Sequence, residues 1–379
     1  MRGTPGGARS APRGLAVALG ERSYPIRLGA GTLAAAGPEI ARRTRARLAV
    51  VISVPSVARR YAGALERSLR AAGLRTHRLV VPEGDRTKRL AVVAHLYEAL
   101  LAAGADRSSA IVALGGGMVG DLAGFTAATF MRGIAFVQVP TTVLAMVDAS
   151  IGGKVGVNLP QGKNLVGAFH QPKLVWIDVA TLRSLPVRER AAGFAEVVKS
   201  AALWDAAFFA RLERDAEALL ALEPRPLLRA IGRAVAIKAE IVALDERESG
   251  PRMLLNLGHT LGHAVEALTG YRSVLHGEAV AMGMVYAARR SEELGYAPAG
   301  TALRVEALLR RFGLPTELPR FPRGAYLAAL EVDKKKKDGR IRYVVLRGIG
   351  RAETVPLTLA RILPAGRTEG RSRRPGKHT

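Results

Sequence analysis

The chain has 379 residues, and its 57 lysines and arginines against 32 aspartates and glutamates give a formal net charge of +25 at pH 7. Hydrophobic residues (49%) and charged residues (23%) occur in the proportions of an ordinary globular protein, which excludes a wholly disordered chain. Because the chain has no cysteine, disulfides and thiolate metal sites are excluded, and any metal must be held by histidines and carboxylates. The length predicts two domains, since single hydrophobic cores stop growing at about 250–300 residues.

Part of the positive charge lies in two terminal segments, 1–14 and 363–379. Both are rich in glycine, proline, arginine and serine, and we predict that they are disordered basic tails. A nucleic-acid-binding protein would account for the remaining excess, but the sequence has no helix-turn-helix, RNA-binding or zinc-finger signature and few aromatic residues for stacking on bases. We therefore expect no specific nucleic-acid partner. Since no apolar run reaches about 18 residues, we also expect no membrane partner and a cytoplasmic protein.

Residues 15–187 alternate short β-branched runs with longer segments rich in alanine, leucine and arginine, which is typical of a Rossmann-like α/β domain. Helices are predicted at Val57–Ala72 and at Thr87–Ala103, the second ended by Gly104. The β-branched runs predict strands at Leu48–Val54, Thr76–Val81, Ala110–Leu114, Ala135–Val139 and Leu174–Ile177.

Residues 188–362 have a different pattern, in which apolar residues recur with the helical period of 3.6. One late apolar run, Ile341–Leu346, predicts a small strand. This half is therefore expected to be mostly α-helical, with the active site in the cleft between the two domains. The predicted helices are Val187–Leu203, Ala206–Leu222, Pro226–Leu244, Thr260–Thr269, Glu278–Leu294 and Thr301–Phe312.

A glycine-rich turn follows the strand predicted at Ala110–Leu114. Gly115, Gly117 and Gly120 form the pattern G-x-G-x-x-G between a strand and a helix, where backbone N–H groups can approach a pyrophosphate. The alternative is a tight turn without a binding role, which would show the same glycine pattern. About 20 residues further on, where dehydrogenases place an acid for the ribose hydroxyls, there is no carboxylate.

The segment from Pro140 to Pro172 collects polar side chains among glycines, with little amphipathic periodicity, and predicts a long functional loop. Lysines beside glycine suit phosphate groups, because a flexible ammonium can reach an anion where the backbone comes close. A solvated surface loop is the alternative. The polar side chains are Asp148, Lys154, Asn158, Lys163, Asn164 and His170.

Three histidines and two acids fall between residues 259 and 278. His259 and His263 are spaced i and i+4, so they share a helix face, and spacing alone predicts them as a metal-binding pair. The metalloprotease pattern H-E-x-x-H is excluded, because Thr260 occupies the position of the glutamate. Glu266, His276 and Glu278 complete the cluster.

Six long motifs resemble those of the 3-dehydroquinate synthase family of sugar phosphate cyclases, between about Pro82 and Leu346. They are GGGMVGDLAGF, RGIAFVQVPTTVLAMVDASIGGKVGVN, GKNLVGAFHQP, GFAEVVKSA, LLNLGHTLGHAVE and LHGEAVAMGM. The resemblance implies conversion of 3-deoxy-D-arabino-heptulosonate 7-phosphate to 3-dehydroquinate and phosphate, a step of the shikimate pathway. The implied chemistry is transient oxidation by bound NAD, phosphate elimination, re-reduction and intramolecular aldol closure, which makes the chain a carbon-oxygen lyase.

The resemblance also implies the site residues. Metal ligands would be Glu196, His259 and His276, holding zinc or, as the alternative, cobalt, and His263 becomes a substrate group. NAD contacts would be Glu83, Gly84, Asp85, Arg86, Thr87, Lys88, Gly117, Met118, Val119, Gly120, Asp121, Thr141, Thr142, Lys154, Lys163, Thr181, Leu182, Arg183 and Ser184. Substrate groups would be Arg132, Asp148, Lys154, Asn164, Lys199, Lys238, Arg252, Asn256, His263 and one lysine of the run Lys334–Lys337, for which Lys335 is favoured.

Two other enzyme classes remain as alternatives: a sugar phosphate cyclase acting on another sugar, and a metal-dependent polyol dehydrogenase of similar two-domain build. The Gly152-Gly153-Lys154 and Gly162-Lys163-Asn164 triplets favour the dehydroquinate synthase form. A polyol also needs fewer basic residues than a substrate that carries a phosphate and a carboxylate. The expected partner is thus a small phosphorylated sugar acid, and the family implies a homodimer.

Overall fold

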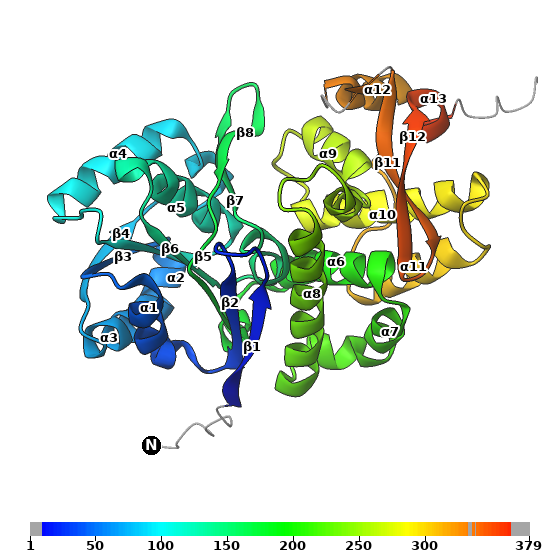
Figure 1. Ribbon diagram of the computed structural model, residues 1–379. Coiled ribbons are helices and arrows are strands. Elements are labelled where there is room, and N and C mark those ends of the chain that lie inside the picture. The colour runs from blue at the N-terminus through cyan, green and yellow to red at the C-terminus, as the bar shows by residue number, and fades with distance from the viewer. Residues whose placement is uncertain (1–9, 333–335, 338, 365–379) are drawn as a thin grey trace, which may run out of the picture.

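The computed structural model describes residues 10–332, 336–337 and 339–364. A sheet-containing half and a mostly helical half lie side by side (Figure 1). This confirms the predicted fold class. Among the described residues, no helix has the length and apolar character needed to cross a membrane.

A seven-stranded sheet with the order β1-β2-β9-β6-β5-β3-β4 forms the first half. β1 and β2 are antiparallel, and the neighbouring pairs from β2 to β4 are parallel. Five of the strands confirm predictions to within a residue at each end: β3 (Leu48–Ser53), β4 (Arg75–Val80), β5 (Ala110–Gly115), β6 (Ala135–Pro140) and β9 (Leu174–Asp178). β1 (Ser10–Val17) and β2 (Tyr24–Ala30) were not predicted.

Helices cover both faces of this sheet, because successive residues of a buried strand point to opposite sides. In β3, Val50 and Ile52 pack with Leu96 of α4, whereas Val51 packs with Leu65 of α3. The helices of this half are α1 (Ala36–Thr44), α2 (Pro55–Val57), α3 (Gly63–Ala71), α4 (Leu90–Ala102) and α5 (Gly117–Thr129).

The first six helices of the second half confirm predictions to within two residues at each end, whereas the last two helices were not predicted. This half also contains a small sheet, of which the sequence predicted only the middle strand. The helices are α6 (Val187–Trp204), α7 (Ala206–Leu220), α8 (Pro224–Leu244), α9 (His259–Leu268), α10 (His276–Glu293), α11 (Thr301–Arg311), α12 (Arg323–Val332) and α13 (Leu359–Ile362). The sheet has the order β10 (Lys336–Lys337), β11 (Arg340–Gly348), β12 (Arg351–Thr358).

One hydrophobic core joins the two halves. Ile26 and Leu28 of β2 and Ile177 of β9 belong to the same buried cluster as Ile231 and Val235 of α8. The secondary structure therefore changes near residue 187 while the packing continues across it. The division into domains 15–187 and 188–362 stays a prediction.

Two sequence predictions need correction. The segment 1–14 does not remain unstructured throughout, because β1 begins at Ser10 and pairs with β2, a long-range contact that the composition of a tail cannot reveal. Residues 1–9 and 365–379 lie outside the described residues.

The segment Pro140–Pro172 is not a long loop. It contains a π-helical turn, Ala145–Ala149, and an antiparallel hairpin of β7 (Lys154–Leu159) and β8 (Gly162–Phe169) that projects beyond the sheet (Figure 1). Glycines in both strands, paired as Gly156 with Gly167, dilute the alternation by which a strand would be predicted.

Candidate active site

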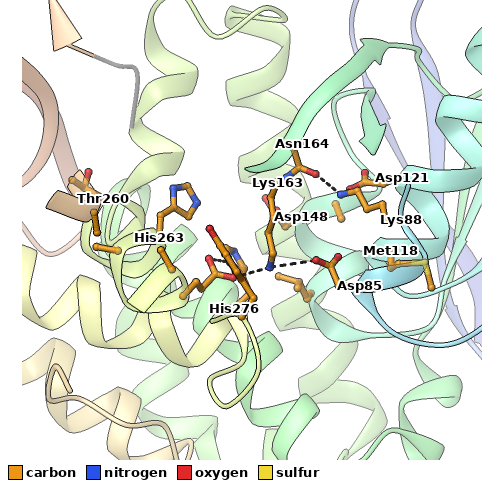
Figure 2. A pocket seen from close by; sticks show the side chains of 18 of the residues that line it. Asp85, Lys88, Met118, Asp121, Asp148, Lys163, Asn164, Thr260, His263 and His276 are labelled. Atoms are coloured by element: carbon orange, nitrogen blue, oxygen red, sulfur yellow. Dashed lines mark hydrogen bonds and ion pairs between the residues drawn. The ribbon is translucent and has the colours of Figure 1, made fainter. Parts of the chain in front are cut away.

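A cavity of about 490 Å³ opens between the two halves (Figure 2). One wall consists of segments that follow the strands of the sheet and of the β7–β8 hairpin, which contribute Asp85, Gly117, Asp148 and Lys163. The opposite wall consists of α9, the start of α10 and α12. Ligands of parallel sheets bind beyond the carboxyl ends of the strands, which is where β5 passes into α5. The predicted sites that line the cavity are Asp85, Lys88, Gly117, Met118, Asp121, Asp148, Lys163, Asn164, His263 and His276.

The glycine turn brings the start of α5 to the cavity. β5 ends at Gly115 and α5 begins at Gly117, so the free N–H groups of its first turn lie beside the cavity. Asp121, on the next turn, accepts a hydrogen bond from Lys88 with Nζ–Oδ2 of 2.5 Å. Lys88 also donates to Asn164 of β8, so it links the nucleotide turn to the hairpin (Figure 2).

Glu196 of α6, His259 of α9 and His276 of α10 form one compact group, and their candidate ligand atoms all lie within 4.8 Å of one another. Glu196 Oε1 lies 3.7 Å from His259 Nε2 and 3.9 Å from His276 Nε2. This oxygen is buried and has no hydrogen-bond partner among the described residues. An orphaned carboxylate oxygen between two imidazole nitrogens fits a metal ion, because each atom is a favourable ligand for zinc.

Contacts outside this group fix the orientation of both imidazoles. The Nδ1 atom of His259 lies 3.3 Å from the carbonyl of Leu257, and that of His276 lies 3.3 Å from Glu266 Oε2. An oxygen acceptor at Nδ1 favours the neutral tautomer that carries its proton on Nδ1, and in that tautomer the lone pair of Nε2 can bind a metal. Burial also lowers the pKa of His259 well below its ordinary value, which keeps that ring neutral and able to bind metal.

A close approach of two helices brings the three residues together. Gly277 follows His276 in α10 and packs on α6, where a Cβ atom at this position would lie 1.8 Å from the carbonyl oxygen of Ala192. Only glycine permits this contact. Glu196 stands one turn further along α6, so the contact positions it opposite His276.

Spacing alone selected a different pair. His263 does not join the three-residue group, and its ring lies 5.4 Å from that of His259, nearly perpendicular to it. His263 lines the cavity instead. The interpretation of His259 and His263 as the metal pair is therefore corrected, because the other two donors, Glu196 and His276, come from other helices that an i, i+4 count cannot register.

Two buried lysines pair with acidic residues of the site. Lys199 pairs with Glu196, and Lys238 of α8 pairs with Asp148 of the π-helical turn. Burial alone would raise the pKa of Asp148, but the charges of Lys238 and Lys199 lower it well below its ordinary value. Asp148 is therefore an anion held between lysines.

The guanidinium of Arg252 is buried, and among the described residues its hydrogen bonds go to backbone carbonyls rather than to carboxylates. Its guanidinium donates to the backbone carbonyls of Glu246 and of Gly152, the second at 3.1 Å. Its exposure is only 2%. Carbonyls satisfy the donors without cancelling the charge of the guanidinium.

Lys154 and Asn256 meet at a residue that the sequence did not single out. Lys154 forms an ion pair with Glu248, and the Asn256 amide donates to the other oxygen of Glu248 at 2.8 Å. Glu246, Glu248 and Tyr24 are the site residues that sequence reasoning missed, whereas Glu266 was noted as an acid of the histidine cluster without a role. None of the three missed residues lies in a recognisable spacing, because each acts through a partner from another element.

Other predicted residues lie away from the cavity. Arg132 is exposed at the end of the turn Phe130–Arg132, and within the described part of the chain no hydrogen bond or ion pair ties it to the cavity lining. The turn that contains Thr181 and Ser184 is bound by the Tyr61 hydroxyl, which donates to the Thr181 carbonyl at 3.0 Å. Lys335 lies outside the described residues.

The remaining nucleotide-side residues lie in ordered turns. Glu83 accepts a hydrogen bond from the Ser56 amide at 2.9 Å, just before the turn Asp85–Thr87. Thr141 is buried, and Thr142 accepts a hydrogen bond from the Ala145 amide at the start of the π-helical turn.

Two family models match the chain in succession. The model of the 3-dehydroquinate synthase N-terminal part matches residues 78–192, and that of the C-terminal part matches residues 193–336. The 3-dehydroquinate synthase of Pelobacter propionicus is 50% identical over 349 residues, which cover 92% of this chain and 97% of the relative. That of Rhodospirillum rubrum is 49% identical over 346 residues, covering 89% and 90%.

Solved structures agree with this assignment. A 2-deoxy-scyllo-inosose synthase complexed with carbaglucose-6-phosphate, NAD+ and Co2+ matches with a TM-score of 0.84 at 28% identity, over 93% of this chain and 99% of the other. A 2-epi-5-epi-valiolone synthase from Streptomyces hygroscopicus with NAD+ and Zn2+ bound matches with a TM-score of 0.83 at 31% identity, over 91% and 96%. A glycerol dehydrogenase from Schizosaccharomyces pombe, at 16% identity and a TM-score of 0.65, shares the fold alone. The chain therefore belongs to the 3-dehydroquinate synthase family.

Proposed function

We propose that the chain converts 3-deoxy-D-arabino-heptulosonate 7-phosphate to 3-dehydroquinate and phosphate, with NAD and a divalent metal, zinc or cobalt, as cofactors. The observation that carries this proposal is the orphaned Glu196 oxygen between His259 and His276, in a group whose His276 borders the same cavity as the glycine turn. Both solved cyclases named above hold NAD+ together with a divalent metal, which supports the cofactor assignment.

Bound NAD supplies reversible hydride acceptance, and a divalent metal supplies a Lewis acid for a substrate hydroxyl. Glu196, His259 and His276 would hold the metal with three protein ligands, which leaves coordination positions for the substrate. Lys199 forms an ion pair with the second oxygen of Glu196, which leaves Oε1 as the oxygen that faces the two histidines. His263, one turn after His259, lines the cavity, where it can hold or transfer a proton.

The basic residues would bind the two anionic groups of the substrate. Lys154, Asn164 and His263 are assigned to the phosphate, where positive charge stabilises the leaving anion. Arg132 was assigned with them, but its exposed position puts it outside the cavity described here. Lys238 and Arg252 are assigned to the carboxylate, Arg252 because a guanidinium can form a bidentate fork.

Asp148 is suited to a positioning role rather than to proton transfer. Its carboxylate is held ionised by Lys238, and a base with so low a pKa accepts a proton poorly near neutral pH. It would orient Lys238 and accept a hydrogen bond from a substrate hydroxyl.

Other cyclases are the main competing class, and substrate preference separates them. Phosphate release should be measured with the metal-loaded protein and NAD, using the heptulosonate phosphate and glucose 6-phosphate in parallel. The proposal predicts a kcat/KM at least about a thousandfold higher for the heptulosonate, because buried cations prepared for a carboxylate reject a substrate that lacks one. Preference for glucose 6-phosphate would assign the chain to another cyclase activity.

The polyol dehydrogenase alternative is less favoured, because the glycerol dehydrogenase match extends to the fold alone. A homodimeric state and a cytoplasmic location stay predictions, and sedimentation analysis of the full chain tests the first.

A further inference from the structure

Glu266 of α9 is a buried carboxylate, 5% exposed, whose two oxygens contact cationic or donor groups from different halves of the protein. Its Oε2 lies 3.3 Å from His276 Nδ1, and its Oε1 lies 3.3 Å from Lys163 Nζ. One carboxylate thus contacts a proposed metal ligand and a residue of the hairpin at the same time.

Lys163 continues this chain of contacts to the nucleotide side. Its Nζ lies 3.4 Å from Asp85 Oδ2, and it stands over the Tyr271 ring at 4.5 Å from the ring centre. Asp85 is itself held by the Asn158 amide, which donates to Asp85 Oδ2 at 3.0 Å. The position of Lys163 is therefore set by Asp85 and Tyr271 as well as by Glu266.

The four side chains Asp85, Lys163, Glu266 and His276 all line the cavity, and their contacts form a continuous series across it. Figure 2 labels Asp85, Lys163 and His276 of this series. At one end lies the turn that borders the glycine loop, and at the other lies the metal group. We propose that Glu266 is a positioning residue that couples occupancy of the NAD site to metal affinity through Lys163. This inference rests on the NAD and metal sites of the proposed function.

The coupling has a simple physical origin. A dinucleotide seated on the Asp85 turn and the glycine loop restricts Asp85 and Lys163, and with them the Glu266 carboxylate that orients the His276 ring. Metal binding then has less side-chain freedom to remove, so the metal binds more tightly. Linkage requires that the metal tighten NAD binding by the same factor.

The test measures the metal dissociation constant of the full chain, with Co²⁺ and a competing chelator, in the absence of NAD and at saturating NAD. NAD saturation is verified for each variant by its own titration. In the wild type, NAD should lower the Co²⁺ dissociation constant at least about fivefold, and Co²⁺ should lower that of NAD equally.

Two variants locate the coupling. Glu266→Gln should weaken Co²⁺ binding by about 10- to 100-fold without NAD, the usual effect of losing a partner behind a metal ligand. It should also abolish the NAD effect. Lys163→Met should weaken Co²⁺ binding less than Glu266→Gln does, yet it should abolish the NAD effect as well.

Glu278→Gln is the matched control. Glu278 is a buried carboxylate near the start of α10 that pairs with Arg188 and accepts from the Leu275 amide, without contacting Lys163. It should keep the wild-type NAD effect, whatever it does to thermal stability.

The outcomes are distinct. A wild type that binds both ligands with no mutual effect would overturn the coupling and leave the proposed function standing. A wild-type NAD effect that persists in both Glu266→Gln and Lys163→Met would also overturn it, because Glu266 would then serve the fold alone. Failure of the wild type to bind NAD at all would instead contradict the proposed function.

Discussion

The two walls of the cavity are built in opposite ways. On the helical side, the metal group comes from three helices, and its carboxylate Glu196 and the neighbouring Lys199 are each only 1% exposed. On the other side, binding groups come from turns and a two-stranded hairpin, and the Lys154 and Lys163 side chains are 49% and 33% exposed. Buried groups on helices hold one geometry, whereas partly exposed groups on a hairpin can adjust to a ligand.

This difference predicts how substitutions act. Changes on the helical wall should abolish the chemistry outright, since the metal group needs all three donors. Substitutions in the turns and the hairpin should each weaken ligand binding only in part, because several residues there contact the same ligand.

The largest expected effect is that of His276→Ala. Removal of this ligand should abolish stoichiometric metal binding and lower kcat by at least about a thousandfold, because several kcal/mol of transition-state stabilisation depend on a Lewis acid. Elemental analysis and a phosphate-release assay check both. His95→Ala, at an exposed histidine, is the control. A metal-replete, active His276→Ala variant would remove His276 from the ligand set.

Arg252→Ala should have the next largest effect. Loss of a charge-assisted contact to the substrate carboxylate should raise KM and lower kcat/KM by about 10- to 100-fold, while bound metal stays at the wild-type level. Arg252→Lys should recover only part of the loss, because it keeps the charge without the fork. Unchanged kinetics in Arg252→Ala would show that Arg252 does not bind the substrate.

Tyr24→Phe should have a smaller effect on substrate binding. The buried Tyr24 hydroxyl accepts a hydrogen bond from the Gly152 amide at 2.9 Å, two residues before Lys154. The variant leaves that donor unsatisfied, which should lower the free energy of unfolding by about 1–3 kcal/mol.

Steady-state kinetics should show a severalfold rise in KM for Tyr24→Phe with little change in metal affinity. Tyr97→Phe removes a hydroxyl that pairs with Thr129 at the surface and serves as the control. Equal stability and kinetics in the two variants would contradict a positioning role for Tyr24.

The smallest effect should appear in the pH dependence of Asp245→Asn. Burial raises the pKa of Asp245, but backbone hydrogen bonds from Ser249, Gly250 and Arg252 outweigh it, so its pKa lies below the ordinary value. Its contribution to stability is therefore present above about pH 4 and is lost as the pH falls below that value.

Urea unfolding at pH 7 and pH 3 checks this prediction. The wild type should exceed Asp245→Asn by about 1 kcal/mol at pH 7, and the gap should narrow at pH 3. A gap that is independent of pH would show that the ionised carboxylate does not anchor the turn leading to Arg252.

The sequence predicted long periodic elements well and contacts between elements poorly. Strands β3, β5 and β9 are uniformly buried, so their apolar runs were visible. β1 depends on its pairing with β2, and the hairpin on glycine-rich strands, so neither leaves a local pattern. Such pairing is a tertiary property, which periodicity cannot register.

In the site, too, local motifs were predictable from the sequence and contacts between distant elements were not. The glycine turn and the histidine cluster stand out in the sequence, but spacing selected His263 where the structure brings Glu196 and His276 to His259. The contact of Gly277 with Ala192, which decides this geometry, joins distant helices. Only the family resemblance identified Glu196, and Glu266 was visible in the histidine cluster but received no role from either route.

The central claim is that NAD acts here as a recycled cofactor in a cyclase. The most direct measurement follows phosphate and NADH together when the metal-loaded chain meets the heptulosonate phosphate and NAD at a small fraction of the substrate. We predict complete release of phosphate with no accumulation of NADH, and its loss when the metal is removed by a chelator. NADH formed in proportion to the substrate consumed, without phosphate release, would contradict the account and indicate a dehydrogenase.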